Sequence, residues 1–264
     1  MSRLDAAFHH PPAFMPYFPL GYPTPEISLD VIEALAKNGA DLIEVGLPFS
    51  DPLADGPVIQ RATQIALEQG MTVKRALAAI RELRIARGVT IPLILMGYFN
   101  PLMAYGLSRL AEEATRSEAD GFIVPDLPLE ESEEFELTLG ELPLIRMLAP
   151  TTSAQRVAAI AQRARGFLYL VSLTGVTGAR SALPEGLPEF IARVREQTTL
   201  PLCVGFGIGT PEQARAVGQI ADGVIIGSAC VKAIGESADP MKAAAEFART
   251  FKATLTAPPD SIPV

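Results

Sequence analysis

Hydrophobic and polar positions alternate along the chain between two kinds of segment. Short apolar runs are followed by longer stretches in which apolar residues recur every three or four positions. The short runs predict β-strands, and the periodic stretches predict amphipathic helices. The expected strands cover residues 13–18, 41–45, 90–97, 121–125, 142–147, 166–172, 200–205 and 222–227.

A helical pattern separates each expected strand from the next. The first helix, 26–37, places Ile27, Val31 and Leu35 on one face. The others are expected over 58–86 with a break near Gly70, over 107–117, 130–138, 152–163 and 186–197, from Thr210 onward, after 227, and over 240–254.

Eight alternations of strand and helix indicate parallel strands joined by crossover helices. The count of eight favours a closed barrel over an open sheet, and no linker or change in composition divides the chain. We therefore predict an α/β fold, a single (β/α)8 TIM barrel. The domain is expected to span residues 1–264, with an N-terminal extension over 1–12 and a flexible tail over 256–264.

Composition narrows the class of partner. The net charge of −8 and pI near 4.9 argue against nucleic acid or an anionic membrane. No uncharged run approaches the ~20 residues of a membrane span, and prolines interrupt the N-terminal region, so no signal peptide is expected. Cys203 and Cys230 lie far apart in apolar runs, which predicts free thiols in a reducing cytoplasm.

The positions of histidine and lysine exclude several kinds of chemistry. His9 and His10, the only histidines, precede the first strand, so no histidine cluster is available to hold a metal or to build a Ser–His–Asp site at the strand ends. None of the five lysines ends an expected strand, where a Schiff-base enzyme needs one. The groups that remain for catalysis are carboxylates, tyrosines and backbone dipoles.

Glu44 lies in the apolar run of the second strand. It is near the carboxyl end of that strand, the edge where barrel enzymes keep their sites. Alternation puts Leu42 and Glu44 on one face and Ile43 and Val45 on the other. Apolar surroundings raise a carboxyl pKa, which suits proton exchange near neutrality. The alternative is a structural acid, bonded to neighbouring backbone or to a tyrosine.

The loop that follows, "LPFSDPLADGP", contains Asp51 and Asp55. Asp-Pro and Asp-Gly-Pro are turn sequences, so either aspartate could serve the loop itself and not the chemistry. Asp126, just after the fourth strand, has the same two interpretations.

Two strand exits are rich in glycine: 204–213 after the seventh strand and 225–232 after the eighth. Thr210 is a good helix cap, and Gly227-Ser228 opens the last short helix. Backbone N–H groups at such helix starts bind anions, and TIM barrels commonly hold phosphate in this place. A third glycine-bearing stretch, 173–186, is long enough to act as a lid. Tight turns are the alternative explanation for these glycines.

With "IEVGLPFSDPLADGP" on the second strand, the sequence resembles the tryptophan synthase alpha chain family. The resemblance extends through "LMGYFNP", "VPDLPLEES", "YLVSLTGVTG" and "GFGIGTPEQ" to "IIGSACVK". Members cleave indole-3-glycerol phosphate to indole and glyceraldehyde 3-phosphate. They pass indole to a beta chain that uses pyridoxal phosphate. The resemblance implies no cofactor in this chain and a beta-chain partner in an αββα heterotetramer.

The same resemblance implies the site. Glu44 matches the catalytic acid/base, Asp55 the second carboxylate, and Tyr169 a tyrosine near the reacting centre. The remaining matches are Tyr17, Tyr98, Ile123 and Phe206 in the indole pocket, Gly178, Gly207, Gly227 and Ser228 at the phosphate, Thr177 at the lid, and Pro48 and Asp51 near the beta-chain face. The chain departs from the family pattern with Tyr22, where relatives often have Asp, and with Leu173, where some have Arg.

Three alternatives remain open at this point. The chain could be a standalone lyase that releases indole, or a non-catalytic partner that only activates the beta chain. It could also be a different phosphate-binding barrel, such as a sugar-phosphate isomerase or a flavin enzyme.

Overall fold

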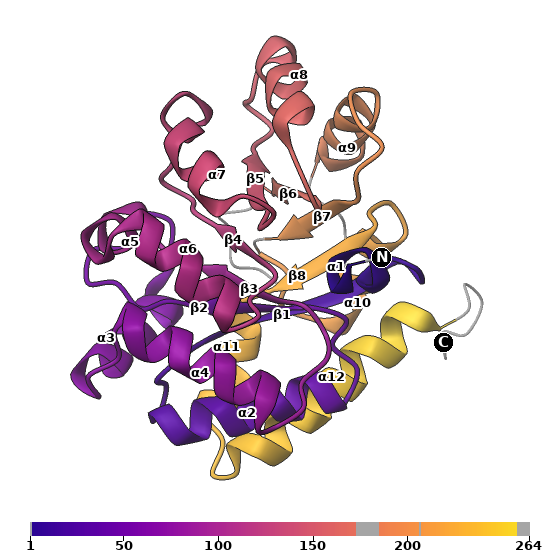
Figure 1. The fold of residues 1–264 in the computed structure, drawn as a ribbon. Helices are drawn as coiled ribbons and strands as arrows, with labels where there is room; N and C mark the ends of the chain where they lie inside the picture. Colours follow the sequence, from indigo (N-terminus) through magenta and orange to yellow (C-terminus); the bar gives the residue numbers. More distant parts are fainter. Residues whose placement is uncertain (1, 173–184, 206, 258–264) are drawn as a thin grey trace.

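Eight parallel strands close into a barrel in sequence order, with β8 paired back to β1 (Figure 1). The computed structural model describes residues 2–172, 185–205 and 207–257. The predicted TIM barrel is confirmed, whereas the extent of the domain and the flexible tail stay predictions. The strands are β1 (Ala13–Pro19), β2 (Ile43–Gly46), β3 (Leu93–Met96), β4 (Gly121–Ile123), β5 (Leu144–Leu148), β6 (Leu168–Val171), β7 (Leu202–Gly205) and β8 (Gly223–Ile226).

Helices surround the barrel, and every predicted helix is present. They are α1 (Arg3–Ala7), α2 (Pro25–Lys37), α3 (Pro57–Glu68), α4 (Val73–Ile85), α5 (Phe99–Tyr105), α6 (Leu107–Arg116), the 3-10 turn η1 (Leu129–Glu131), α7 (Glu133–Leu139), α8 (Ala154–Arg163), α9 (Leu187–Arg195), α10 (Pro211–Gly218), α11 (Ser228–Gly235) and α12 (Pro240–Thr256). The expected break near Gly70 separates α3 from α4, because Gly70 has a φ of +76°. Within the described ranges, no helix combines the length and the apolar character that a bilayer crossing requires.

Strand β1 shows how the barrel and the helices share one core. Phe14 points outward, where its ring stacks on Phe251 of α12 with centroids 5.8 Å apart. Tyr17 is opposite Glu44 of β2 in the strand register. Alternation along the strand therefore puts Phe14 among the helices and Tyr17 inside the barrel. The outer layer is completed by α12, which packs on α2 and β1, and by an ion pair of 2.6 Å between Lys252 and Asp41.

Asp120, directly before β4, organises a buried ion-pair network at the amino ends of the strands. Its carboxylate accepts hydrogen bonds from Arg84 of α4, from Arg3 of α1 at 2.8 Å, and from the N–H of Leu93 at 2.8 Å. Helix α1 lies within the expected N-terminal extension, and its Leu4 is buried. The extension therefore contacts the barrel through α1.

Replacing Asp120 with asparagine is expected to lower the free energy of unfolding by about 1.5–3 kcal/mol, the usual contribution of a hydrogen bond to a charged group. The Arg84 side chain is only 2% exposed and loses its anionic partner in this variant. Urea denaturation measures the change. The matched control is Glu112→Gln, whose partner Arg116 is 71% exposed. That variant should change stability by less than about 1 kcal/mol. Equal effects in the two variants would contradict a stabilising role for the network.

Candidate active site

Glu44 is enclosed inside the barrel. It is 1% exposed and pairs in register with Tyr17 of β1 and Ile94 of β3. Its charge contributes to the raised pKa values of Tyr17, Tyr169 and Cys203, so these inward-facing groups lie around the carboxyl. In this register, the face of β2 that carries Glu44 points into the barrel.

The carboxyl of Glu44 has an unusual environment for an acid. Burial raises its pKa well above the ordinary value. Its Oε1 atom is buried and accepts no hydrogen bond from the described residues. A structural acid would have its buried oxygens paired, so this oxygen does not support the structural interpretation of Glu44. Burial instead favours the neutral form of this carboxyl and leaves one of its oxygens without a partner.

The raised pKa predicts a pH dependence of stability. In the folded state Glu44 holds its proton above the pH at which an unfolded-chain glutamate, with a pKa of about 4.3, releases it. Stability due to this group is therefore full below the unfolded pKa and is lost as pH rises through the raised folded pKa. Between the unfolded and the folded pKa of Glu44, the unfolding free energy of the wild-type chain should fall relative to that of Glu44→Gln. The fall is at most about 1.4 kcal/mol per pH unit. Urea denaturation of both proteins over a pH series measures this difference, and parallel curves would contradict it.

Two tyrosines cross over glycines of the neighbouring strands. A Cβ atom on Gly46 of β2 would lie 2.2 Å from the hydroxyl oxygen of Tyr17, and one on Gly205 of β7 would lie 2.2 Å from that of Tyr169. Both tyrosines are buried. These two glycines leave the space in which the phenols lie, and sequence reasoning missed them. A glycine inside a strand pattern, which often marks a close approach, was the signal available.

Asp55 lies in the loop between β2 and α3, half-buried at the carboxyl end of the barrel. Tyr98 accepts a hydrogen bond of 2.9 Å from the N–H of Ala54, and its hydroxyl lies near Asp55. Burial raises the pKa of Asp55, and the nearby hydroxyl of Tyr98 opposes that rise. The charges of Asp55 and Glu44 both raise the pKa of Tyr17. The structure thus brings these two carboxyls together around Tyr17.

The other loop acids lie apart from this centre. Asp51 is exposed and accepts a hydrogen bond from the Ser50 hydroxyl, while Pro48 is half-buried. Asp126 accepts a hydrogen bond of 2.9 Å from the N–H of Phe99 at the start of α5. Asp126 was expected to serve either the chemistry or the loop. This contact is the one expected of a residue that holds the loop in place.

The starts of α10 and α11 differ in their capping. At α10, Thr210 and Gln213 form a capping box, and Gln213 also accepts the N–H of Gly209 at 2.8 Å. At α11, Gly227 provides no side-chain cap, so the first-turn N–H groups from Ser228 onward remain for an anion. A Cβ on Gly227 would lie 3.9 Å from the Cβ of Tyr17. The uncapped helix start therefore adjoins Tyr17, the tyrosine whose pKa both carboxyls help to raise.

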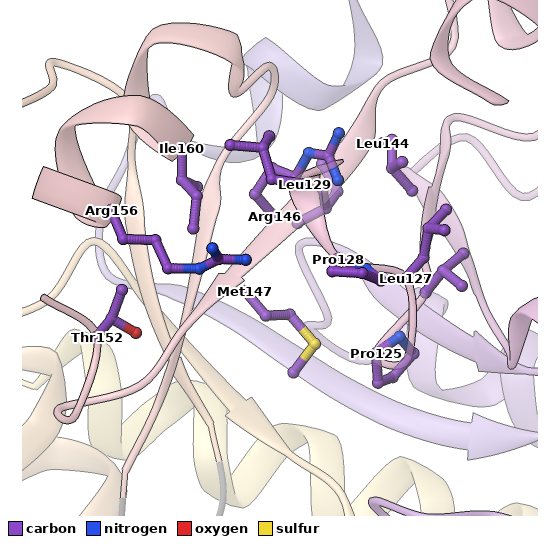
Figure 2. Close-up of a pocket in the computed structure, with 12 residues that line it drawn as sticks. Pro125, Leu127, Pro128, Leu129, Leu144, Arg146, Met147, Thr152, Arg156 and Ile160 are labelled. Carbon is purple, nitrogen blue, oxygen red and sulfur yellow. The ribbon is translucent and has the colours of Figure 1, made fainter. Parts of the chain in front are cut away.

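A separate cavity of about 140 Å³ lies between the segment after β4, strand β5 and helix α8 (Figure 2). Met147 and Arg156 line it from β5 and α8, and Pro125 and Pro128 line it from the segment after β4. Glu44 and Asp55 do not line this cavity, and sequence reasoning did not predict it.

Some predicted site residues lie outside the described ranges. These are Thr177, Gly178, Phe206 and most of the expected lid, 173–186. Ile123, at the end of β4, is fully buried, and Gly207 is exposed with a φ of +76°. In the part of the chain that the structure describes, no group of three His, Cys, Asp or Glu side chains is arranged to hold a metal ion.

Comparison with known proteins decides the family. A family model described as "Tryptophan synthase alpha chain" matches residues 5–257. The chain belongs to the tryptophan synthase alpha chain family. It is 48% identical over 250 residues to the tryptophan synthase alpha chain of Chloroflexus aurantiacus, covering 93% of this chain and 94% of that one. It is 50% identical over 255 residues to that of Roseiflexus castenholzii, covering 95% and 97%.

Solved structures agree with the tryptophan synthase alpha assignment. The Legionella pneumophila alpha subunit superposes with a TM-score of 0.88 at 37% identity, covering 97% of this chain and 98% of that one. A chain of Mycobacterium tuberculosis tryptophan synthase superposes with a TM-score of 0.86 at 34% identity, covering 97% and 99%. The predicted resemblance is confirmed. As a tryptophan synthase alpha chain, the protein is a lyase that cleaves indole-3-glycerol phosphate.

Proposed function

We propose that Glu44 and Asp55 perform a retro-aldol cleavage of indole-3-glycerol phosphate by acid–base catalysis. The observation that carries the proposal is the buried Glu44 carboxyl, with its raised pKa and its unpartnered Oε1. Asp55 shares the same tyrosine neighbour. Breaking the bond at indole C3 requires a proton at that carbon and the loss of one from the side-chain hydroxyl. A carboxyl that is protonated near neutral pH serves both transfers.

The proton balance closes on Glu44. The protonated carboxyl gives its proton to indole C3, which leaves positive charge on the ring and a carboxylate on the enzyme. The carboxylate then takes the hydroxyl proton while the carbonyl of glyceraldehyde 3-phosphate forms. The electrons of the breaking C–C bond return to the ring, indole leaves, and Glu44 is protonated again. Asp55 accepts a hydrogen bond from the indole N–H and stabilises the ring cation in between.

Substrate binding is assigned around this pair. The indole ring lies against Tyr17, Tyr98, Ile123 and Phe206, with Tyr169 near the reacting centre. The phosphate binds at Gly178, Gly207, Gly227 and Ser228, and Thr177 contacts the strand-two loop from the lid. The uncapped start of α11 beside Tyr17 supports the phosphate assignment.

The assembly follows from the family. The chain pairs with a beta chain in an αββα heterotetramer, and Pro48 and Asp51 lie near the shared face. Leu53 of the same loop is 86% exposed, which supports an interface there. Pyridoxal phosphate belongs to the beta chain, and this chain needs no cofactor of its own. Its two buried free thiols support a cytoplasmic location.

The test is detection of indole from indole-3-glycerol phosphate, with the purified chain alone and with a beta chain. A rate strongly stimulated by the beta chain supports the proposal. Equal rates would make the chain a standalone lyase. Activation of the beta chain without any indole release would make it a non-catalytic partner. Calorimetry with indole propanol phosphate adds a binding test, because a different phosphate-binding barrel predicts no binding.

A further inference from the structure

The cavity between the segment after β4, strand β5 and helix α8 has both apolar and cationic walls (Figure 2). Leu129 of η1, Met147 of β5 and Ile160 of α8 supply apolar side chains, and Arg146 and Arg156 supply guanidiniums. The volume of about 140 Å³ is close to the ~150 Å³ of an engineered cavity that binds benzene. The space therefore suits an apolar group of about the size of a benzene ring.

Arg146 places a buried cation in the wall of this cavity. Its side chain is 5% exposed, and its Nη2 atom donates to the Ser132 hydroxyl at 2.5 Å and to the Glu136 carboxylate. Its Nε atom is also buried, but it donates to no acceptor among the described residues. Buried donors almost always have a partner. The free Nε–H is therefore a position at which an acceptor atom of a ligand would be stabilised.

The ion pairs beside the cavity are not balanced in charge. Arg146 and Arg163 share the carboxylate of Glu136, and Arg156 donates to both oxygens of Glu130 at 2.5 and 2.8 Å. Among the described residues of this network, three guanidiniums thus face two carboxylates. Burial also lowers the pKa of Arg146, which means that its charge is poorly solvated. One further negative charge would balance the network.

The cavity opens toward solvent on the side of η1 and α8. Pro128 and Arg156, which line it on that side, are both exposed. Figure 2 shows the Arg156 side chain extending from α8 toward β5. A ligand can therefore enter past Arg156 and reach Arg146 behind it.

We propose that this cavity is a binding site for a small monocarboxylate with a compact apolar body, such as an aromatic ring. The carboxylate accepts the Nε–H of Arg146 in a charge-assisted hydrogen bond. The apolar body lies against Leu129, Met147 and Ile160. An inorganic anion would leave these walls uncovered, and a neutral ring would leave the charge unbalanced. Because Glu44 and Asp55 do not line the cavity, this inference does not depend on the catalytic roles proposed for them.

Benzoate is the probe for this site, and the arginine Nε–H signals of the full-length chain are the readout. The Arg146 signal is assigned by its loss in Arg146→Met. Benzoate, with nine heavy atoms, should bind with a Kd of roughly 1 mM. It should shift the Arg146 Nε–H signal downfield, as a new acceptor does. Benzamide has the same shape without the charge, and acetate lacks the ring, so each should bind at least about tenfold more weakly.

Two arginine variants test whether the Nε–H itself is used. Arg146→Met should weaken benzoate binding, measured by calorimetry, at least about tenfold. The matched control is Arg163→Met, which removes the other guanidinium on Glu136 but does not line the cavity. Its affinity should stay within about threefold of wild type. If Arg146→Met does not fold, Leu129→Trp replaces it, because a large ring at this half-buried position fills the cavity and should abolish binding.

Several results would overturn the proposal. One is the absence of benzoate binding at about 10 mM, ten times the expected Kd. Another is binding that leaves the Arg146 Nε–H signal in place, because the ligand would then lie elsewhere. Equal affinities for benzoate and benzamide, or equal losses in Arg146→Met and Arg163→Met, would also contradict it. None of these measurements needs turnover, so they stand whether or not Glu44 and Asp55 prove catalytic.

Discussion

Glu44→Gln lowers kcat for the cleavage of indole-3-glycerol phosphate by about 10²–10⁴ fold, the usual contribution of a positioned acid–base group. Glutamine keeps the size of the side chain but neither delivers nor accepts the proton that the reaction transfers. Because burial raises the pKa of the Glu44 carboxyl and so favours its neutral form, a neutral amide is a close electrostatic match for it inside the barrel. Indole release under saturating substrate, with the beta chain present, measures the effect.

Two controls separate chemistry from folding. Glu68→Gln changes an exposed residue at the end of α3 and should keep wild-type turnover. Calorimetry should show that Glu44→Gln still binds indole propanol phosphate, because the assigned phosphate site lies at the start of α11. Full activity of Glu44→Gln would remove Glu44 from the chemistry. Loss of analogue binding would show that the side chain serves the shape of the pocket.

Asp55→Asn should lower kcat by a similar factor, about 10²–10⁴ fold. Its carboxylate is assigned to the indole N–H, where it stabilises a ring that carries positive charge only after C3 is protonated. Asparagine still offers an oxygen, but not the negative charge. The loss should therefore fall mainly on kcat and less on KM. Steady-state kinetics of the variant measure the split.

Tyr98→Phe is the informative companion to Asp55→Asn. It removes the hydroxyl that lies near Asp55 and accepts the N–H of Ala54, so the loop loses this hydrogen bond while the carboxylate remains. A smaller loss than in Asp55→Asn is expected. If Asp55→Asn kept turnover within threefold of wild type, Asp55 would be a turn residue, the other interpretation of its Asp-Gly-Pro sequence.

The barrel was predictable because its signals are local and repeated. Each strand is a short apolar run and each long helix has a periodic face, so their order was correct throughout. The second strand was expected over 41–45 but covers Ile43–Gly46. Asp41 lies outside it because its side chain accepts the N–H of Phe14 and pairs with Lys252. Helices α1 and α5, of five and seven residues, are too short to show a periodic face.

The site was predictable only in part. Glu44 stands out because an acid in an apolar strand is rare, and the sequence placed it at the correct edge of the barrel. Gly205 gives only the weak signal of a glycine in a strand pattern, since the phenol of Tyr169 that crosses it comes 36 residues earlier in the chain and approaches it only after the strands pair. The same holds for Gly46, whose missing side chain acquires its meaning from the phenol above it.

The pairing of β8 with β1, and the cover that Phe251 gives to Phe14, have a consequence for biosynthesis. On the ribosome, the first strand emerges with one edge unpaired and an aromatic ring uncovered. Both are satisfied only after more than two hundred further residues have been added, roughly 10–50 s at ordinary rates of translation. During that interval the nascent chain exposes an unpaired strand edge. Chaperones that shield such edges therefore have the longest time to act on the first strand.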